Sequence, residues 1–350
     1  EHFARVTSSS EYYPKARFHL GVIANLEGRY SRAISMFESA KNDGSKSLRT
    51  QANLNIARVH YEQKKYRQAF RYYALVDRKS DQWLDTIFET SWAFYILKKH
   101  NNTLGNIHTI HSPFFEDRFY PEAYVLQAIT FLRLCRLDEV KKSLKAFQRK
   151  YKPVNTALKR MLGEYRGRPT AFFRLVNKYH NGSLSRYQKV WSIVDSLSRT
   201  DIYKGARKTI RNSDKELQKL GNAPRSWQSV GLYDEIKNFL KKKKSAAVAS
   251  GGKNLFMKAR DYQNYLKRLS DQTTFIQLEM NLNKIDGLRK KLNVKGAENK
   301  NLNFIGGLQE LKVGQDLEYW PFQGEYWEDE LGGYIYNVNS NCGSGSGGKK

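Results

Sequence analysis

The apolar and polar positions of residues 13–40 alternate with the helical period and predict two short helices joined by a tight turn at Gly28. Small residues stand where the two helices must approach closely, with Gly21 and Ala24 on the first and Ala33 on the second. A single pair of this kind cannot bury both of its apolar faces, so it should recur along the chain and stack on its copies.

The pattern does recur in the first half of the chain. Laid without gaps on residues 120–147, the first pair places Gly21 on Ala128 and Gly28 on Cys135. Two further pairs are expected at residues 51–76 and 83–110, the second with its turn at His100, and Phe3 and Val6 resemble the end of an earlier one. A spacing of about 34 residues with small and large residues at set positions is typical of the tetratricopeptide repeat, so we expect four units and further repeats upstream.

The second half is expected to consist of long helices. After Pro153 the repeat period is lost, and we predict helices over 183–220 and 226–244, a small-residue linker over 245–252 and a third helix beyond it. In that third helix apolar residues are spaced alternately by four and three, which indicates a heptad seam: Leu255, Ala259, Tyr262, Leu266, Leu269, Thr273, Ile276 and Met280. We interpret residues 183–292 as an antiparallel coiled coil, with an ordinary helical bundle as the alternative.

The predicted fold is therefore all-α, a tetratricopeptide-repeat superhelix followed by long antiparallel helices and a short aromatic C-terminal segment with a possible strand at 334–338. The expected divisions are the end of a truncated repeat at 1–11, four repeats at 12–152, the long helices at 153–300, an acidic aromatic tail at 301–342 and a flexible end at 343–350.

Charge is spread unevenly over the 350 residues. The formal net charge is +27, yet residues 301–342 hold seven acids against Lys312 alone. A body this basic should attract polyanions and also its own acidic tail. The 40% apolar fraction argues against a disordered chain. No apolar run approaches the roughly 18 residues that span a bilayer, and no basic-then-apolar signal segment opens the chain.

Two stretches resemble a known group of proteins. The first is Ser112-Pro113-Phe114-Phe115-Glu116-Asp117 with the preceding repeat and the Phe119-Tyr120-Pro121-Glu122 that follows, and the second is residues 319–332, YWPFQGEYWEDELG. Both resemble exported tetratricopeptide proteins of deltaproteobacteria, the predatory and gliding bacteria. The resemblance implies an envelope scaffold, periplasmic or associated with the outer membrane, that has envelope proteins as partners and is part of an envelope or motility machine. It supplies no catalytic residues.

The inner wall of such an array is lined by the first helix of each pair. Its aromatic, basic and amide side chains suit an extended peptide or a partner helix: Lys15, Phe18, Asn25, Arg58, Tyr61, Phe88, Trp92 and Tyr95. The alternative is that the long helices of the same chain fill this groove, because so apolar a wall should not stay in contact with water.

Cys135 and Cys342 are the two cysteines of the chain. We expect a disulfide that clamps the tail to the fourth repeat, which would require an oxidising compartment. Closing so long a loop would stabilise the fold by about 4–5 kcal/mol in the chain-entropy model. Two unrelated free thiols are the alternative.

The other candidate sites are weaker. The basic run Lys241, Lys242, Lys243 and Lys244 suits phosphate groups, or is simply a solvated helix end. Residues of the tail are expected to dock on the body: Trp320, Phe322, Trp327 and Glu330. The tail acids could act as paired carboxylates only if they converged in a cleft. The histidines at 100, 108 and 111 lack companion ligands, and Gly251-Gly252-Lys253-Asn254 does not have the phosphate-loop spacing.

The leading hypothesis is a non-enzymatic protein-binding scaffold without cofactor, metal or small-molecule substrate. The runner-up is a basic module that binds nucleic acid, anionic lipid or a cell-wall polymer. A hydrolase is the third hypothesis, and it requires a cleft with a carboxylate of raised pKa.

Overall fold

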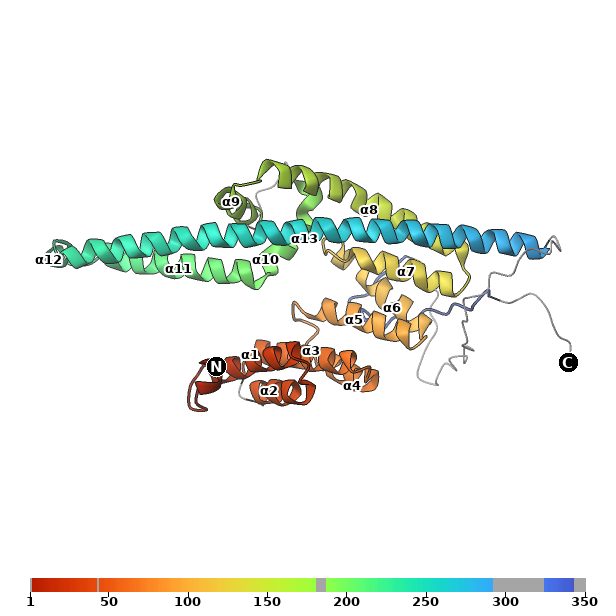
Figure 1. The fold of residues 1–350 in the computed structure, drawn as a ribbon, viewed down its shortest axis with the longest axis horizontal. Coiled ribbons are helices and arrows are strands. Elements are labelled where there is room, and N and C mark those ends of the chain that lie inside the picture. The colour runs from red at the N-terminus through yellow and green to blue at the C-terminus, as the bar shows by residue number, and fades with distance from the viewer. Residues whose placement is uncertain (1, 43, 181–186, 292–323, 343–350) are drawn as a thin grey trace. The chain divides into compact units, whose positions relative to one another are not determined.

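The computed structural model describes residues 2–42, 44–180, 187–291 and 324–342, and its regular structure is helical (Figure 1). The all-α prediction is confirmed. The described residues contain no strand, so the strand expected at 334–338 is wrong. The chain divides into two compact units, Glu1–Pro113 with Gly296–Lys350, and Phe114–Lys295.

The first unit consists of consecutive helix pairs. They are α1 (Tyr13–Leu26) with α2 (Tyr30–Asn42), α3 (Lys46–Glu62) with α4 (Tyr66–Tyr73), and α5 (Trp83–Ile96) with α6 (His100–Ile110), preceded by the 3-10 turn η1 (His2–Arg5). Each helix packs on the next one in the chain. Gly21 permits the close approach of α1 and α2, because a Cβ there would lie 2.7 Å from the Phe37 ring.

The turn inside each pair is the same main-chain structure. Gly28, Lys64, Lys98 and Cys135 all have positive φ, between 53° and 71°. At each turn this residue donates its N–H to the carbonyl three residues back, and the following residue donates to the carbonyl five back, with distances of 2.8–3.0 Å. This is the Schellman arrangement that ends a helix with a left-handed residue. It places Gly28 and Cys135 at equivalent positions, as the alignment predicted, whereas His100 begins α6 and Lys98 occupies the turn.

The second unit begins with a fourth pair and continues into longer helices. After the 3-10 turn η2 (Pro113–Phe115), its elements are α7 (Pro121–Arg133), α8 (Leu137–Glu164), α9 (Pro169–His180), η3 (Gln188–Val190), α10 (Trp191–Arg199), α11 (Asp201–Gly221), α12 (Arg225–Gln228) and α13 (Gly231–Lys291). Because α8 runs through Pro153, the boundary expected between residues 152 and 153 lies inside a helix.

The single helix predicted over 183–220 is wrong in its described part, 187–220. Thr200 interrupts it with an extended backbone, φ −67° and ψ 149°, and its hydroxyl accepts a hydrogen bond from the N–H of Tyr203. This contact is an N-cap, which supplies a partner for one of the free N–H groups at the start of α11.

The linker predicted over 245–252 is also wrong, because α13 continues through it as one helix (Figure 1). A Cβ on Gly252 would lie 1.9 Å from the carbonyl oxygen of Pro169 in α9, and one on Gly251 would lie 3.0 Å from the Cβ of Ala206 in α11. The small residues therefore allow α13 to approach α9 and α11 closely.

The predicted apolar stripe of α13 is buried. Leu255, Ala259, Leu266 and Ile276 are at most 6% exposed, and Tyr262 is half-buried. The stripe faces several helices rather than a single antiparallel one, since α13 packs against α7, α8, α9, α10 and α11.

Candidate functional site

The groove residues predicted from the sequence lie on three helices of the first unit. Lys15, Phe18 and Asn25 are on α1, Arg58 and Tyr61 on α3, and Phe88, Trp92 and Tyr95 on α5. Lys15 is exposed and the others are half-buried. These residues form what we call the first-helix face.

Arg58 links α3 to α5 through a carboxylate that the sequence analysis missed. Its guanidinium donates to Glu89 from Nη2 at 2.6 Å and from Nε at 3.0 Å, and the hydroxyl of Tyr73 in α4 donates to the same carboxylate at 3.0 Å. Burial opposes the charge of Arg58, but the hydrogen bond and the charge of Glu89 outweigh it and raise the pKa of Arg58. Burial and the Glu89 charge raise the pKa of Tyr73. Arg58 therefore helps to hold α3 against α5. Its separation from Glu89 by 31 residues, close to one repeat, is the sequence feature that could have predicted this ion pair.

Aromatic rings remain partly accessible on the same face. Tyr61 packs edge-on against Tyr66 with a centroid distance of 5.5 Å, and Trp92 against Tyr95 at 5.8 Å. Phe18 differs from them, since it packs against the buried Phe37 at 5.4 Å and belongs to the core. The half-buried aromatics of this face outside that core are thus Tyr61, Phe88, Trp92 and Tyr95.

The corresponding face of α7, in the second unit, is covered by the chain itself. Tyr265 of α13 donates its hydroxyl to Glu122, and Phe119 packs on Tyr262 of α13 at 5.1 Å. Burial raises the pKa of Tyr265, followed in size by its hydrogen bond to Glu122. At this helix pair, a long helix of the same chain therefore covers the face, which was the alternative to binding a partner.

The described part of the tail, residues 324–342, docks on α5 and α6. Arg78 donates from Nη2 to the main-chain oxygens of Leu331 at 2.8 Å and Asp329 at 3.1 Å. The N–H of Tyr336 donates to the carbonyl of Asn101 at 3.1 Å. A Cβ on Gly105 would lie 1.7 Å from the carbonyl oxygen of Tyr334, so the tail main chain lies directly on α6.

The contacts that the structure shows for the tail are made by side chains that the sequence analysis did not name. His108 stacks on Tyr326 at 4.6 Å and meets Tyr334 edge-on at 4.8 Å, while Leu331 is buried. Trp327 is 59% exposed and Glu330 is also exposed. Trp320 and Phe322 lie outside the described residues. In the part of the tail that the structure describes, ring stacking and main-chain hydrogen bonds therefore contribute to docking.

Cys135 and Cys342 form one pair at disulfide distance, and neither is free. The predicted disulfide is confirmed. Cys135 contributes the left-handed residue of the fourth turn and is half-buried.

The predicted basic run lies within α13. Lys241, Lys242 and Lys243 are exposed, whereas Lys244 pairs with Asp214 of α11 at 2.5 Å. Lys243 also lies 5.7 Å from the centre of the Phe239 ring. Three of the four lysines are thus exposed at the surface of the helix.

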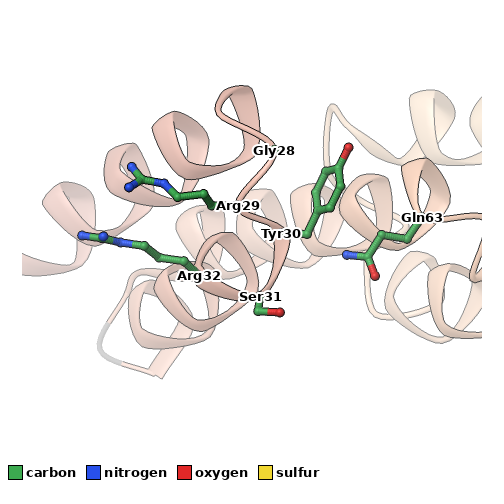
Figure 2. Close-up of a pocket in the computed structure, with 6 residues that line it drawn as sticks. All are labelled: Gly28, Arg29, Tyr30, Ser31, Arg32 and Gln63. Atoms are coloured by element: carbon green, nitrogen blue, oxygen red, sulfur yellow. The ribbon is translucent and has the colours of Figure 1, made fainter.

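One open hollow, of about 530 Å³, lies beside the first turn. Figure 2 shows Arg29 and Arg32 extending on the same side of it; its lining is Gly28, Arg29, Tyr30, Ser31, Arg32 and Gln63. No histidine, cysteine or carboxylate belongs to this lining. Over the described ranges, no three His, Cys, Asp or Glu residues gather as metal ligands would, and no helix is long and apolar enough to cross a bilayer.

The chain matches no protein-family model, no curated protein and no solved structure.

Proposed function

We propose that this protein is a non-enzymatic scaffold that binds an extended segment or a helix of a partner protein on the first-helix face. The observation that carries the proposal is the pair Trp92 and Tyr95, which are half-buried on α5 with their ring centroids 5.8 Å apart. Flat rings offer a large contact area at little cost in conformational entropy, and such residues dominate binding energy at interfaces.

The frame beneath these rings suits a binding surface. The Arg58–Glu89 pair fixes α3 against α5 with Tyr73 as a third member. A surface held in place by buried packing and hydrogen bonds loses less entropy on binding. We further propose that the helix pairs, with their four equivalent turns, are tetratricopeptide repeats in a superhelix, and that α11 and α13 form an antiparallel coiled-coil arm.

We place the scaffold in the bacterial envelope, periplasmic or associated with the outer membrane. The disulfide supports this compartment, since such bonds persist in oxidising surroundings and are rare in the cytosol. The resemblance to exported deltaproteobacterial proteins points the same way. Thiol trapping in acid-quenched cells should find Cys135 and Cys342 both blocked; two labelled thiols would contradict the placement.

The binding proposal is tested by crosslinking mass spectrometry on cells that produce the full chain. Trp92→Ala and Tyr95→Ala should each weaken capture of the crosslinked partner by roughly 30-fold, the size expected of an interface hot spot. Phe114→Ala is the matched control, because Phe114 is 53% exposed and lies outside the face. Circular dichroism should show unchanged helix content in all three. Equal capture by every variant would refute this site.

A polyanion-binding module is the second candidate, and the exposed lysines 241, 242 and 243 favour it. It predicts retention on heparin that falls steeply with salt. Partner capture through Trp92 and Tyr95 should instead resist salt, so the same chain distinguishes the two functions.

A further inference from the structure

The helices α11 and α13 form a hairpin that α12 closes. Ala206 of α11 lies next to Gly251 of α13, and Asp214 pairs with Lys244, so the two helices run antiparallel. Figure 1 shows α12 at the closed end of this pair. Gln228 fixes the turn, since its amide donates to the carbonyl of Ala223 at 2.7 Å.

This closed end exposes large apolar side chains. Trp227 is 40% exposed, Val230 49%, Leu232 53% and Phe239 61%. Leu232 and Phe239 are seven residues apart, so they share one face of α13. Single exposed apolar residues are common, but here four lie within 13 residues, and we call these four the patch; clustered exposed apolar residues mark interaction sites.

The patch is flanked by positive charge. Residues 215–244 contain eight basic residues and three acidic ones, and one of those acids, Glu216, is paired with Lys219 at 3.1 Å. Lys237 lies 5.3 Å from the Tyr233 ring centre, and Lys243 follows Phe239 by one helical turn. Apolar groups therefore occupy the end of the hairpin together with the acids Asp234 and Glu235, and the exposed lysines 241, 242 and 243 follow Phe239 on α13.

We propose that the closed end of the hairpin, with Trp227, Val230, Leu232 and Phe239 as anchors, attaches to an anionic lipid bilayer surface. Tryptophan is favoured at the boundary between headgroups and acyl chains, and aliphatic side chains enter the acyl region. Lysines behind them meet anionic headgroups, each strengthening attachment about fivefold. A nucleic acid would use the lysines equally but gives no role to Val230 and Leu232. This site is separate from the first-helix face, so either can fail alone.

The test is co-sedimentation of the full chain with phosphatidylcholine vesicles, with and without phosphatidylglycerol as about a third of the lipid. Attachment should require phosphatidylglycerol and weaken with salt. Lys241→Gln, Lys242→Gln and Lys243→Gln together should reduce it about 100-fold, at fivefold for each lysine. Trp227→Ala with Phe239→Ala should also release the chain, whereas Phe114→Ala should not, since Phe114 is 53% exposed but lies outside the patch.

A second measurement separates insertion from mere attraction between charges. Vesicles with brominated acyl chains should quench tryptophan fluorescence in the native chain, and Trp227→Phe should remove most of this quenching while attachment persists. Attachment that does not depend on phosphatidylglycerol, quenching that survives Trp227→Phe, or stronger competition by duplex DNA than by the vesicles would each overturn the proposal. So would self-association through the patch in analytical ultracentrifugation that Trp227→Ala abolishes while attachment stays unchanged.

Discussion

Gly252→Ala tests whether the small residues of α13 are required for helix packing. The substitution should destabilise the fold if they are, and stabilise it if they are not. A glycine in the interior of an unhindered helix costs about 1 kcal/mol relative to alanine, so the substitution should stabilise a site without close neighbours. At Gly252 the new Cβ would lie 1.9 Å from the Pro169 carbonyl oxygen and 3.2 Å from the Cβ of Phe173. The nearest atom belongs to the main chain and cannot rotate away, so α9 must move by about 1 Å.

Overpacking of this kind typically costs about 1–3 kcal/mol. Set against the gain in helix propensity of about 1 kcal/mol, the expected net destabilisation of the contact between α9 and α13 is about 0–2 kcal/mol. Because the chain has two units, a single unfolding midpoint would mix their contributions. Native-state hydrogen exchange of peptides from α9 and α13 is the better assay, with exchange expected to be up to about 30 times faster.

Gly205→Ala is the matched control, because a Cβ at Gly205 in α11 would meet nothing within 4 Å. That variant should slow exchange in α11. If Gly252→Ala were protected as well as Gly205→Ala, the close approach of α9 to α13 would be wrong.

Three further predictions concern the turns, the tail and the disulfide. Lys98→Gly should stabilise the first unit by about 1 kcal/mol in thermal unfolding, since the φ of Lys98 is 61°, while Lys99→Gly, outside the left-handed region, should not. Burial lowers the pKa of His108, so below the usual value of 6.5 the unfolded chain takes up a proton that the folded chain resists. Stability should therefore fall as the pH drops from about 6.5 towards the folded pKa, and His108→Asn should flatten that difference in pH-dependent melts. Reduction of the Cys135–Cys342 disulfide should lower the unfolding free energy by roughly 5 kcal/mol in the chain-entropy model, and unchanged denaturant curves with and without reductant would count against it.

Much of the first half of the fold follows from local pattern. The small residues Gly21, Ala24 and Ala33 predict where helices approach closely, and Gly28 predicts a turn with a left-handed residue. Lys64 and Lys98 adopt the same conformation without any such signal, because the main-chain hydrogen bonds of the turn outweigh a modest backbone preference.

The second half depends on tertiary contacts that composition conceals. The small residues of 245–252 predict a linker when only the residue types are considered. In the structure Gly251 and Gly252 are buried where α13 packs on other helices. The helix boundary at Thr200 could have been predicted from the sequence, since threonine before aspartate is a common N-cap pattern.

The sites show the same limit. The first-helix face could be placed from repeat spacing, but the partner of Arg58 lies one repeat away, and only the fold brings Glu89 to it. In the tail the sequence predicted docking, but of the side chains it named, Trp327 and Glu330 are exposed and the other two lie outside the described residues. Tyr326 and Tyr334 pack against the buried ring of His108, whereas Trp327 is exposed to solvent.

The turn that ends each first helix accepts different side chains at its left-handed position. Its geometry is held by main-chain hydrogen bonds alone, so the side chain at the left-handed position is nearly free to vary: glycine at 28, lysine at 64 and 98, cysteine at 135. Cys135 can therefore form a disulfide while it holds the same turn geometry as Gly28, Lys64 and Lys98. The same position in the other pairs is a ready attachment point for a label, a second crosslink or a new ligand.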